Sequence, residues 1–133
     1  MDSNVESYLR KHIPLSAGID ITVLKADHSN VSIEAPLPPN INHQSTAFGG
    51  SLAALAILTG WALVHLRLRS EGLVTETVIH SSAVRYDLPV KGTFKAVTEG
   101  ITDKVWSRFT ETLTKRGKGR IRVTVTLESE GEV

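Results

Sequence analysis

One long apolar segment in the middle of the chain restricts its fold more than any other feature. Residues 47–66 carry apolar side chains on every side of the helix that they would form. Such a helix must be buried all round, in the core of a domain or in a membrane. The segment is about as long as a bilayer span. Because Gly49, Gly50, Thr59 and His65 interrupt it, we expect the core helix of a soluble domain and no membrane partner.

Composition excludes several classes of protein. The 133 residues are 41% hydrophobic and 22% charged, which fits a single globular domain spanning residues 1–133. No cysteine is present, which rules out disulfides, a thiolate nucleophile and zinc–sulfur sites. The net charge of +1 gives no reason to expect a nucleic-acid partner. No spacing of His, Asp and Glu is typical of a metal site. The N-terminal residues do not form a signal peptide, so we expect a cytoplasmic protein.

Hydrophobic periodicity and turn residues predict the other elements. Before the core helix we expect a helix over 4–12 that Pro14 ends, a hairpin of two strands over 18–36 that begins at about Ile19, and an extended loop after Pro36, Pro38 and Pro39. The core helix should begin between Thr46 and Ser51 and end near Gly72. After it we expect strands over 74–86 and 92–100, a helix over 103–115, a turn over 115–119 and a last strand over 121–128.

These elements together indicate an α+β fold. Strands lie on both sides of the core helix in the sequence, and that helix needs burial on every side. An antiparallel sheet wrapped around the helix satisfies both requirements.

A polar loop leads into two glycines at the start of the core helix. Residues 40–46 are mainly Asn, His, Gln, Ser and Thr, and Gly49 and Gly50 follow. The first N–H groups of a helix have no partner within it and the helix dipole is positive there, so an anion or a developing oxyanion is stabilised. Glycine lets a ligand approach the backbone. The alternative is that both glycines only permit close helix–sheet packing.

Several stretches of the sequence carry a family likeness. The most specific is the block from Pro39 to Leu55, with Asn-x-Asn near its start and Thr-Ala-Phe-Gly-Gly-Ser at its centre. Gly60-Trp61 and residues 85–90 and 116–121 add to it. On these residues the chain resembles the hotdog-fold proteins, and more narrowly the bacterial thioesterase family typified by the YiiD C-terminal domain. The likeness covers nearly the whole chain.

The resemblance implies a hotdog fold and a homodimer with a continuous sheet, and such dimers can pair into a dimer of dimers. It also implies an acyl thioester substrate, carried on coenzyme A or on an acyl carrier protein, and no cofactor besides the coenzyme A of the substrate. Phe48 stands where related acyl-CoA thioesterases have a histidine, and residues 55–58 lack the carboxylate that those relatives often carry. A non-catalytic module that binds acyl ligands is therefore the alternative to a hydrolase. A dehydratase would need a paired His and carboxylate, which the sequence does not offer.

The catalytic candidates surround the start of the core helix. The N–H groups of Gly49 and Gly50 would hold the thioester carbonyl, and Asn42 would position the attacking water. His43, or a polar group such as Ser82 on the 74–86 strand, would activate that water. The simpler interpretation of Asn42 is a loop residue, and that of His43 is an exposed side chain.

The substrate-binding candidates are more widely spread. Asn40, Thr46, Phe48 and Ser51 come from the loop and the helix start, and Ser81 comes from the 74–86 strand; Thr46 and Ser51 could equally be helix caps. Arg116 and Lys118 could bind the phosphates of coenzyme A. The alternative is that they are solvated charges of a surface turn that keep the protein soluble. The acyl chain would occupy an apolar channel between subunits, lined in part by Leu52, Leu55 and Trp61.

Overall fold

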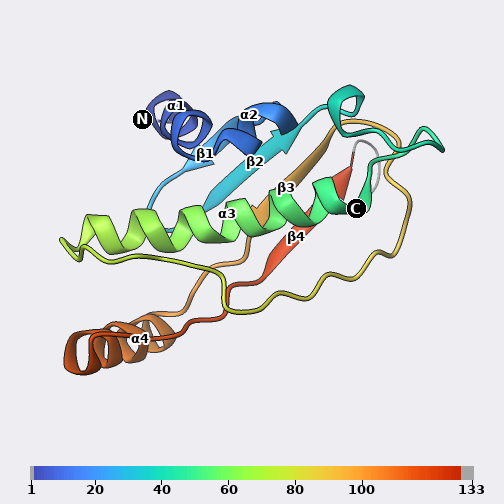
Figure 1. Cartoon of the computed structure of the whole chain (residues 1–133). Coiled ribbons are helices and arrows are strands. Elements are labelled where there is room, and N and C mark those ends of the chain that lie inside the picture. The colour runs from blue at the N-terminus through green and yellow to red at the C-terminus, as the bar shows by residue number, and fades with distance from the viewer. Residues whose placement is uncertain (1, 130–133) are drawn as a thin grey trace.

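The computed structural model describes residues 2–129 (Figure 1). The helices are α1 (Asp2–His12), α2 (Pro14–Ile19), the short 3₁₀ helix η1 (Pro38–Asn40), α3 (Gly49–Ser70) and α4 (Asp103–Arg116). The strands are β1 (Thr22–Ala26), β2 (Val31–Ala35), β3 (Phe94–Thr98) and β4 (Val125–Ser129).

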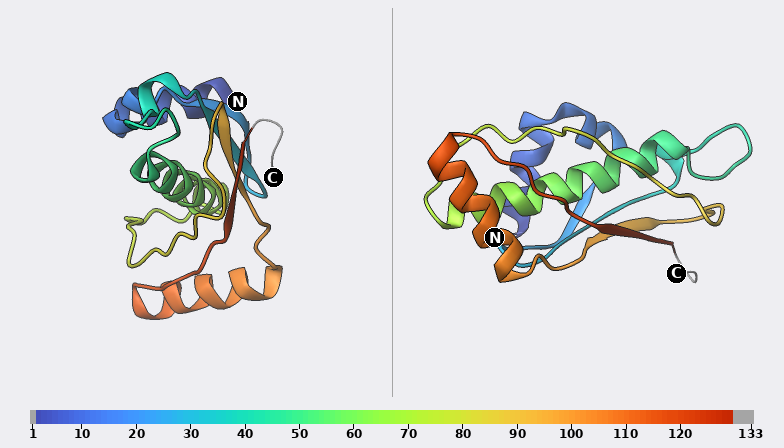
Figure 2. Two further views of the ribbon diagram at one scale, coloured as in Figure 1. Left: turned by 90° about the vertical axis from the view of Figure 1, so that its right-hand side faces the viewer. Right: turned by 90° about the horizontal axis from the view of Figure 1, so that it is seen from below.

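The four strands form one antiparallel sheet in the order β1-β2-β3-β4. Helix α3 lies along one face of this sheet, while α1 and α2 cover the end near β1 and α4 lies at the opposite side (Figures 1 and 2). The expected α+β hotdog architecture, with a long central helix against an antiparallel sheet, is confirmed.

The core lies between α3 and the inner face of the sheet. Strands β2 and β3 bury alternate residues, so that Ile33 and Phe94 point into the core while Glu34 and Lys95 are part-exposed. Leu55 supplies a fully buried side chain from α3. By length and composition α3 is also apolar enough to cross a membrane. Half of its most apolar 18-residue segment is buried within the chain. Its contacts with the sheet make it the core helix.

The end of α3 follows from its sequence. Gly72 has a positive φ of 73°, a conformation that glycine adopts without steric cost. The N–H of Leu73 donates to the Leu68 carbonyl at 2.9 Å, and the N–H of Gly72 donates to the Arg69 carbonyl at 3.0 Å. This pair of hydrogen bonds is a Schellman motif, and it satisfies carbonyls that the helix itself leaves open. The expected helix end near Gly72 is confirmed.

A second, smaller apolar cluster attaches α4 to the C-terminal half of α3. Trp106 and Phe109 of α4 are buried against Val64 and Leu68. The Trp106 indole N–H donates to the Glu71 carboxylate at 2.7 Å. The helix expected over 103–115 is confirmed, and it presents only one face to the core.

The N-terminal region differs from the expectation. Pro14 does not simply end the first helix, because it also occupies the first turn of α2, where its fixed φ suits a helix and its missing N–H costs nothing. Ile19, expected at the start of a strand, is the last residue of α2. Asp20 then takes a left-handed conformation, and β1 begins at Thr22. Likewise, the loop expected to stay extended after Pro36 contains η1.

The strand expected over 74–86 is not formed. Residues 73–93 belong to no strand, although this stretch runs extended beside α3 (Figure 1). A strand needs backbone donors and acceptors on a neighbour, and the described part of the chain supplies none to 74–86. Two side-chain hydrogen bonds hold the stretch: from Trp61 Nε1 to the Thr77 carbonyl at 2.7 Å, and from Tyr86 Oη to the Gly49 carbonyl at 2.9 Å.

The last strand is shorter than the 121–128 expected. Its ladder with β3 begins at Val125, and before it only Thr124 joins, accepting from the Glu99 N–H at 2.9 Å. The predicted alternation is nevertheless right, because Val123, Val125 and Leu127 all pack against the main core.

Gly60 provides a test of the contact between α3 and the β4 region. A Cβ at Gly60 would lie 3.4 Å from a methyl of Val125 and 3.6 Å from one of Val123. We expect Gly60→Ala to match or exceed the wild type in stability by up to about 1 kcal/mol, since alanine is the better helix former. Gly60→Leu should cost about 1–3 kcal/mol by overpacking. Urea unfolding measures both; an unaffected Gly60→Leu would contradict the close packing.

Candidate functional site

The N-terminus of α3 presents two unpaired backbone donors. Phe48 is the N-cap residue, and its side chain cannot accept a hydrogen bond. Its carbonyl accepts from the N–H groups of Ser51 at 2.9 Å and Leu52 at 3.2 Å. Within residues 2–129 no acceptor is bonded to the N–H of Gly49 or Gly50. The positive end of the helix dipole lies at the same place. These two donors are available to an anion.

Two aromatic side chains border the donors. The Tyr86 hydroxyl donates to the Gly49 carbonyl, and a Cβ placed on Gly49 would lie 3.6 Å from the Tyr86 ring. On the other side, a Cβ on Gly50 would overlap the ring of Phe48. The absence of a side chain at Gly50 is therefore required for Phe48 to lie across the helix start. Tyr86 is a site residue that sequence analysis left out, although its place at the end of the extended run was visible.

A cavity of about 240 Å³ opens beside Gly49. Its lining combines the start of α3 with the end of the 74–90 stretch and is mostly apolar: Ala47, Gly49, Leu52, Tyr86, Asp87, Leu88, Pro89 and Val90. The N–H of Ala47 donates to the Val90 carbonyl at 2.8 Å, which fixes the two walls together. The volume lies below the range of about 300–1,000 Å³ that is typical of pockets for small molecules.

Asp87 is the one carboxylate among the residues that line this cavity. It makes two hydrogen bonds with the Arg85 guanidinium, at 3.0 and 3.3 Å. Both side chains are largely exposed. Asp87 stands two residues before Pro89, a position typical of a turn residue; the structure brings it to the cavity because the chain turns back there onto Ala47.

Asn40 and Asn42 both have their amides occupied within the loop. Asn40 is buried and its Nδ2 donates to the carbonyls of Ile19 at 2.9 Å and Pro36 at 2.8 Å. The Asn42 Oδ1 accepts from two loop N–H groups, and its Nδ2 donates to Thr46 Oγ1 at 2.9 Å. These bonds shape the loop, and neither Asn40 nor Asn42 is among the residues that line the cavity.

The remaining loop candidates are less constrained. His43 is exposed. It belongs to the loop between η1 and α3, which projects beyond the start of α3 (Figures 1 and 2), and Ser45 takes a positive φ of 63° in that loop. Thr46 is part-exposed and bonded to Asn42. The structure gives neither Thr46 nor Ser51 a role as the N-cap of α3, which is Phe48.

Ser81 and Ser82 are exposed on the unpaired stretch and do not line the cavity. Of the residues expected in an acyl channel, only Leu52 borders the cavity; Leu55 is fully buried in the core. Trp61 stacks on His65 with ring centroids 4.6 Å apart. Burial, and to a lesser extent the charge of Arg69, lowers the pKa of that histidine.

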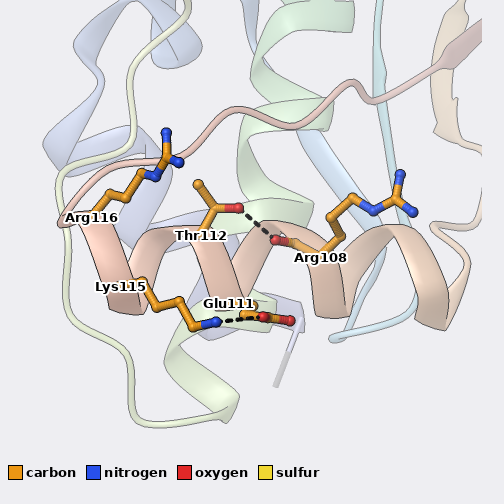
Figure 3. A pocket seen from close by; sticks show the side chains of 5 residues that line it. All are labelled: Arg108, Glu111, Thr112, Lys115 and Arg116. Carbon is orange, nitrogen blue, oxygen red and sulfur yellow. Dashed lines mark hydrogen bonds and ion pairs between the residues drawn. The ribbon is translucent and has the colours of Figure 1, made fainter.

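Arg116 and Lys118 lie far from Gly49 within the same chain. Helix α4 packs on the C-terminal half of α3, and the 22 residues of α3 span about 33 Å at the helical rise of about 1.5 Å per residue. Arg116 lines a second, open cavity of about 480 Å³ on α4, together with Arg108, Glu111, Thr112 and Lys115 (Figure 3).

No metal centre is found in the part of the chain that the structure describes: residues 2–129 hold no group of three or more His, Asp or Glu side chains close enough to bind an ion.

Comparison with known proteins agrees with the geometry. Over 99% of its length the chain is similar in structure to a protein of unknown function from Chlorobaculum tepidum (TM-score 0.92, 26% identity, 81% of that chain). The chain is also similar to a protein from Shewanella oneidensis described as a "putative thioesterase", with a TM-score of 0.83 and 25% identity over 98% of this chain and 88% of that one.

A "probable thioesterase" from Pseudomonas aeruginosa shares the fold at 17% identity (TM-score 0.80, 100% of this chain and 88% of that one). Residues 2–133 match the family described as "Putative thioesterase (yiiD_Cterm)". The chain therefore belongs to this thioesterase-like family of hotdog proteins.

Proposed function

We propose that this protein hydrolyses an acyl thioester, carried on coenzyme A or on an acyl carrier protein, at the N-terminus of α3. The observation that carries the proposal is the pair of unpaired N–H groups of Gly49 and Gly50 beside a mostly apolar cavity. Membership of a thioesterase-like family supports it.

The two donors suit the oxygen of the thioester carbonyl. Water attacks the carbonyl carbon, the C=O electron pair moves onto oxygen, and the resulting oxyanion is held by the N–H groups of Gly49 and Gly50. The tetrahedral intermediate then collapses, its C–S bond breaks, and the thiolate leaves and takes up a proton. Preorganised donors of this kind act on the charge that develops in the transition state.

The attacking water needs a proton acceptor, and two side chains are candidates. Asp87 lines the cavity and is held in place by Arg85. His43, expected from the sequence, is exposed on the projecting loop. We favour Asp87 because it lines the same cavity as Gly49, whereas His43 is not among the residues that line this cavity.

The state in which the enzyme works is a homodimer paired through the 74–86 stretch. That stretch is extended and has no neighbouring strand among residues 2–129, and it exposes Val74 by 97% and Val78 by 81%. Antiparallel pairing with the same stretch of a second copy would satisfy its backbone and cover these side chains, as a twofold axis requires. Ser81 and Ser82 would then lie near the axis.

Two observations favour a second candidate, a module that binds acyl ligands without turnover. Residues 55–58 of α3 contain no carboxylate, and the Phe48 ring lies where a Cβ on Gly50 would be. Thiol release from a series of acyl-CoAs from acetyl to palmitoyl separates the two functions: hydrolysis at one preferred chain length supports the esterase. Acyl-CoA that raises the melting temperature without releasing thiol would support the binding module.

Gly49→Pro removes one of the two proposed donors with little other change. Proline is tolerated at the first position of a helix, and Phe48 before it is already extended, at φ −64° and ψ 132°, as a following proline requires. We expect kcat to fall about 10²- to 10³-fold with a near-normal melting temperature. Gly49→Ala adds a Cβ but keeps the N–H and serves as the control; equal activity of the two variants would remove the oxyanion role.

Asp87→Asn and His43→Gln identify the proton acceptor. If Asp87 accepts the proton, its amide variant should lose about 10²- to 10⁴-fold in kcat, while His43→Gln stays near the wild-type rate. Steady-state hydrolysis of one acyl-CoA measures both, and unfolding midpoints check that the variants are intact. The opposite pattern would transfer the role to His43.

Val78→Asp tests the dimer. An aspartate at this position would bring an unpaired charge into the proposed strand pair and would replace an apolar contact, so we expect the dimer to dissociate to monomers in sedimentation analysis. Thr114→Asp, an equal change at an exposed position of α4, should stay dimeric. A dimer that tolerates Val78→Asp would place the interface elsewhere.

A further inference from the structure

The charges of this chain are unevenly distributed. Residues 103–122, which comprise α4 and the turn after it, contain seven of the 15 Lys and Arg residues and two of the 14 Asp and Glu residues. Their formal net charge is +5, whereas the rest of the chain carries −4. A field of one sign over a small part of the surface attracts partners of the opposite sign.

The two acidic residues of this region are neutralised locally. Asp103 pairs with Arg67 of α3 at 3.3 Å, and Glu111 pairs with Lys115 at 2.8 Å. Within the described residues 2–129, no ion pair is found for Arg108 or Arg116. The positive charge of the helix is therefore available to a partner.

These cations share one side of α4. Lys104, Arg108, Thr112 and Arg116 follow one another at intervals of four residues, which places them along one face of the helix. Figure 3 shows Arg108 and Arg116 directed to the same side, with the Glu111–Lys115 pair on the adjoining side.

The turn after α4 extends this surface. A Cβ at Gly119 would lie 3.2 Å from the Phe109 carbonyl oxygen, so the turn packs closely against the helix. That packing keeps the exposed side chains of Lys118 and Arg120 near the same end. We call Lys104, Arg108, Arg116, Lys118 and Arg120 the basic face.

We propose that the basic face docks an acidic carrier protein that brings the acyl thioester on its flexible arm. This inference rests on the proposed function and names the donor. The cavity on α4 is lined by one helix alone and is open, so it cannot surround a small ligand as binding pockets do. A broad row of exposed charges instead fits a large complementary surface.

Other polyanions fit the basic face less well. The aromatic residues of α4, Trp106 and Phe109, are buried at 3% and 8% exposure, so neither is free to stack on the bases of a nucleic acid. The same apolar side of α4 already packs against α3 and cannot insert into a membrane.

The basic face serves the partner subunit's Gly49 and Gly50 in the proposed dimer. The 74–86 stretch runs opposite to α3, since Thr77 contacts Trp61 and Tyr86 contacts Gly49. Antiparallel pairing of two such stretches brings the start of one α3 to the end of the other, where α4 is attached. A carrier docked on one subunit therefore delivers its thioester across the interface.

Charge reversal tests the docking. We expect Arg108→Glu/Arg116→Glu to lower kcat/KM for the acyl carrier protein by about tenfold or more at low salt. The kcat/KM of this variant should also depend less on salt concentration than that of the wild type. Hydrolysis of acyl-pantetheine, which lacks both carrier and phosphates, should not change. Lys11→Glu/Lys25→Glu alters the net charge equally on exposed residues of α1 and β1 and should behave as the wild type.

The other outcomes each overturn the proposal. An equal loss with acyl-CoA would assign the basic face to the phosphates of coenzyme A. An equal loss with acyl-pantetheine would mean that α4 acts only on the structure of the site. Tighter binding of duplex RNA or of anionic phospholipid vesicles than of the carrier would point to those partners.

Failure of the proposed function is distinguishable from failure of the docking. If the wild type releases no thiol from any substrate, the hydrolase is wrong. Calorimetric titration with the carrier protein then still decides the docking: binding that Arg108→Glu/Arg116→Glu abolishes supports it, and binding that the variant retains overturns it.

Mixed dimers test the crossing between subunits. Dimers of Gly49→Pro alone, or of Arg108→Glu/Arg116→Glu alone, should each hydrolyse the acyl carrier protein substrate slowly. In a mixed dimer, one site combines the intact Gly49 and Gly50 donors of one subunit with the intact basic face of the other. Mixing the two variants should therefore restore turnover of the carrier-bound substrate. Mixtures that never exceed the mean of the two parents would overturn delivery across the interface.

Discussion

The burial of α3 is the constraint on which the rest of the structure depends. Its apolar residues extend around the helix, and at about 25 cal/mol per Å² of apolar surface no other element of this chain gains as much by leaving water. The inner faces of β2 and β3 cover it from the sheet, and α4 covers its C-terminal half through Trp106 and Phe109. The candidate site lies at the N-terminus of this helix.

The two ends of α3 differ in how their unpaired backbone groups are satisfied. At the C-terminus the unpaired carbonyls are satisfied internally, by the Schellman motif at Gly72. At the N-terminus the cap residue is Phe48, which has no oxygen on its side chain to offer. A helix start without a side-chain cap is less stable by about 1 kcal/mol. The chain accepts this cost where Gly49 and Gly50 would meet a ligand.

Sequence patterns were sufficient wherever local chemistry decides the structure. The bounds of α3 follow from the polar-to-apolar boundary at its start and from glycine at its end, and the alternation of β4 follows from the spacing of its apolar residues. Pro14 misled because proline ends one helix as readily as it begins the next. The 74–86 strand could not be judged from its residues, since strand pairing depends on a neighbour that the sequence does not identify.

The candidate site was predicted in part. Gly49 and Gly50 lie where a helix start was expected, because the polar-to-apolar boundary marks it. Asn40 and Asn42 turned out to have their amides engaged by the loop, and the number of partners that an amide finds cannot be read from sequence. Tyr86 and Asp87 reach the cavity only because the chain folds back onto Ala47, a long-range contact with no local signal.

The two hydrogen bonds that hold the 74–86 stretch to α3 have a consequence for assembly. Trp61 and Tyr86 fix it near its two ends and leave its backbone open between them. An edge that is already extended loses less conformational entropy on association than a disordered one would. In the proposed dimer, the fold of a single copy would therefore already present an ordered interface, and its thermal stability would depend on protein concentration. Dilution would then favour dissociation and lower the melting temperature.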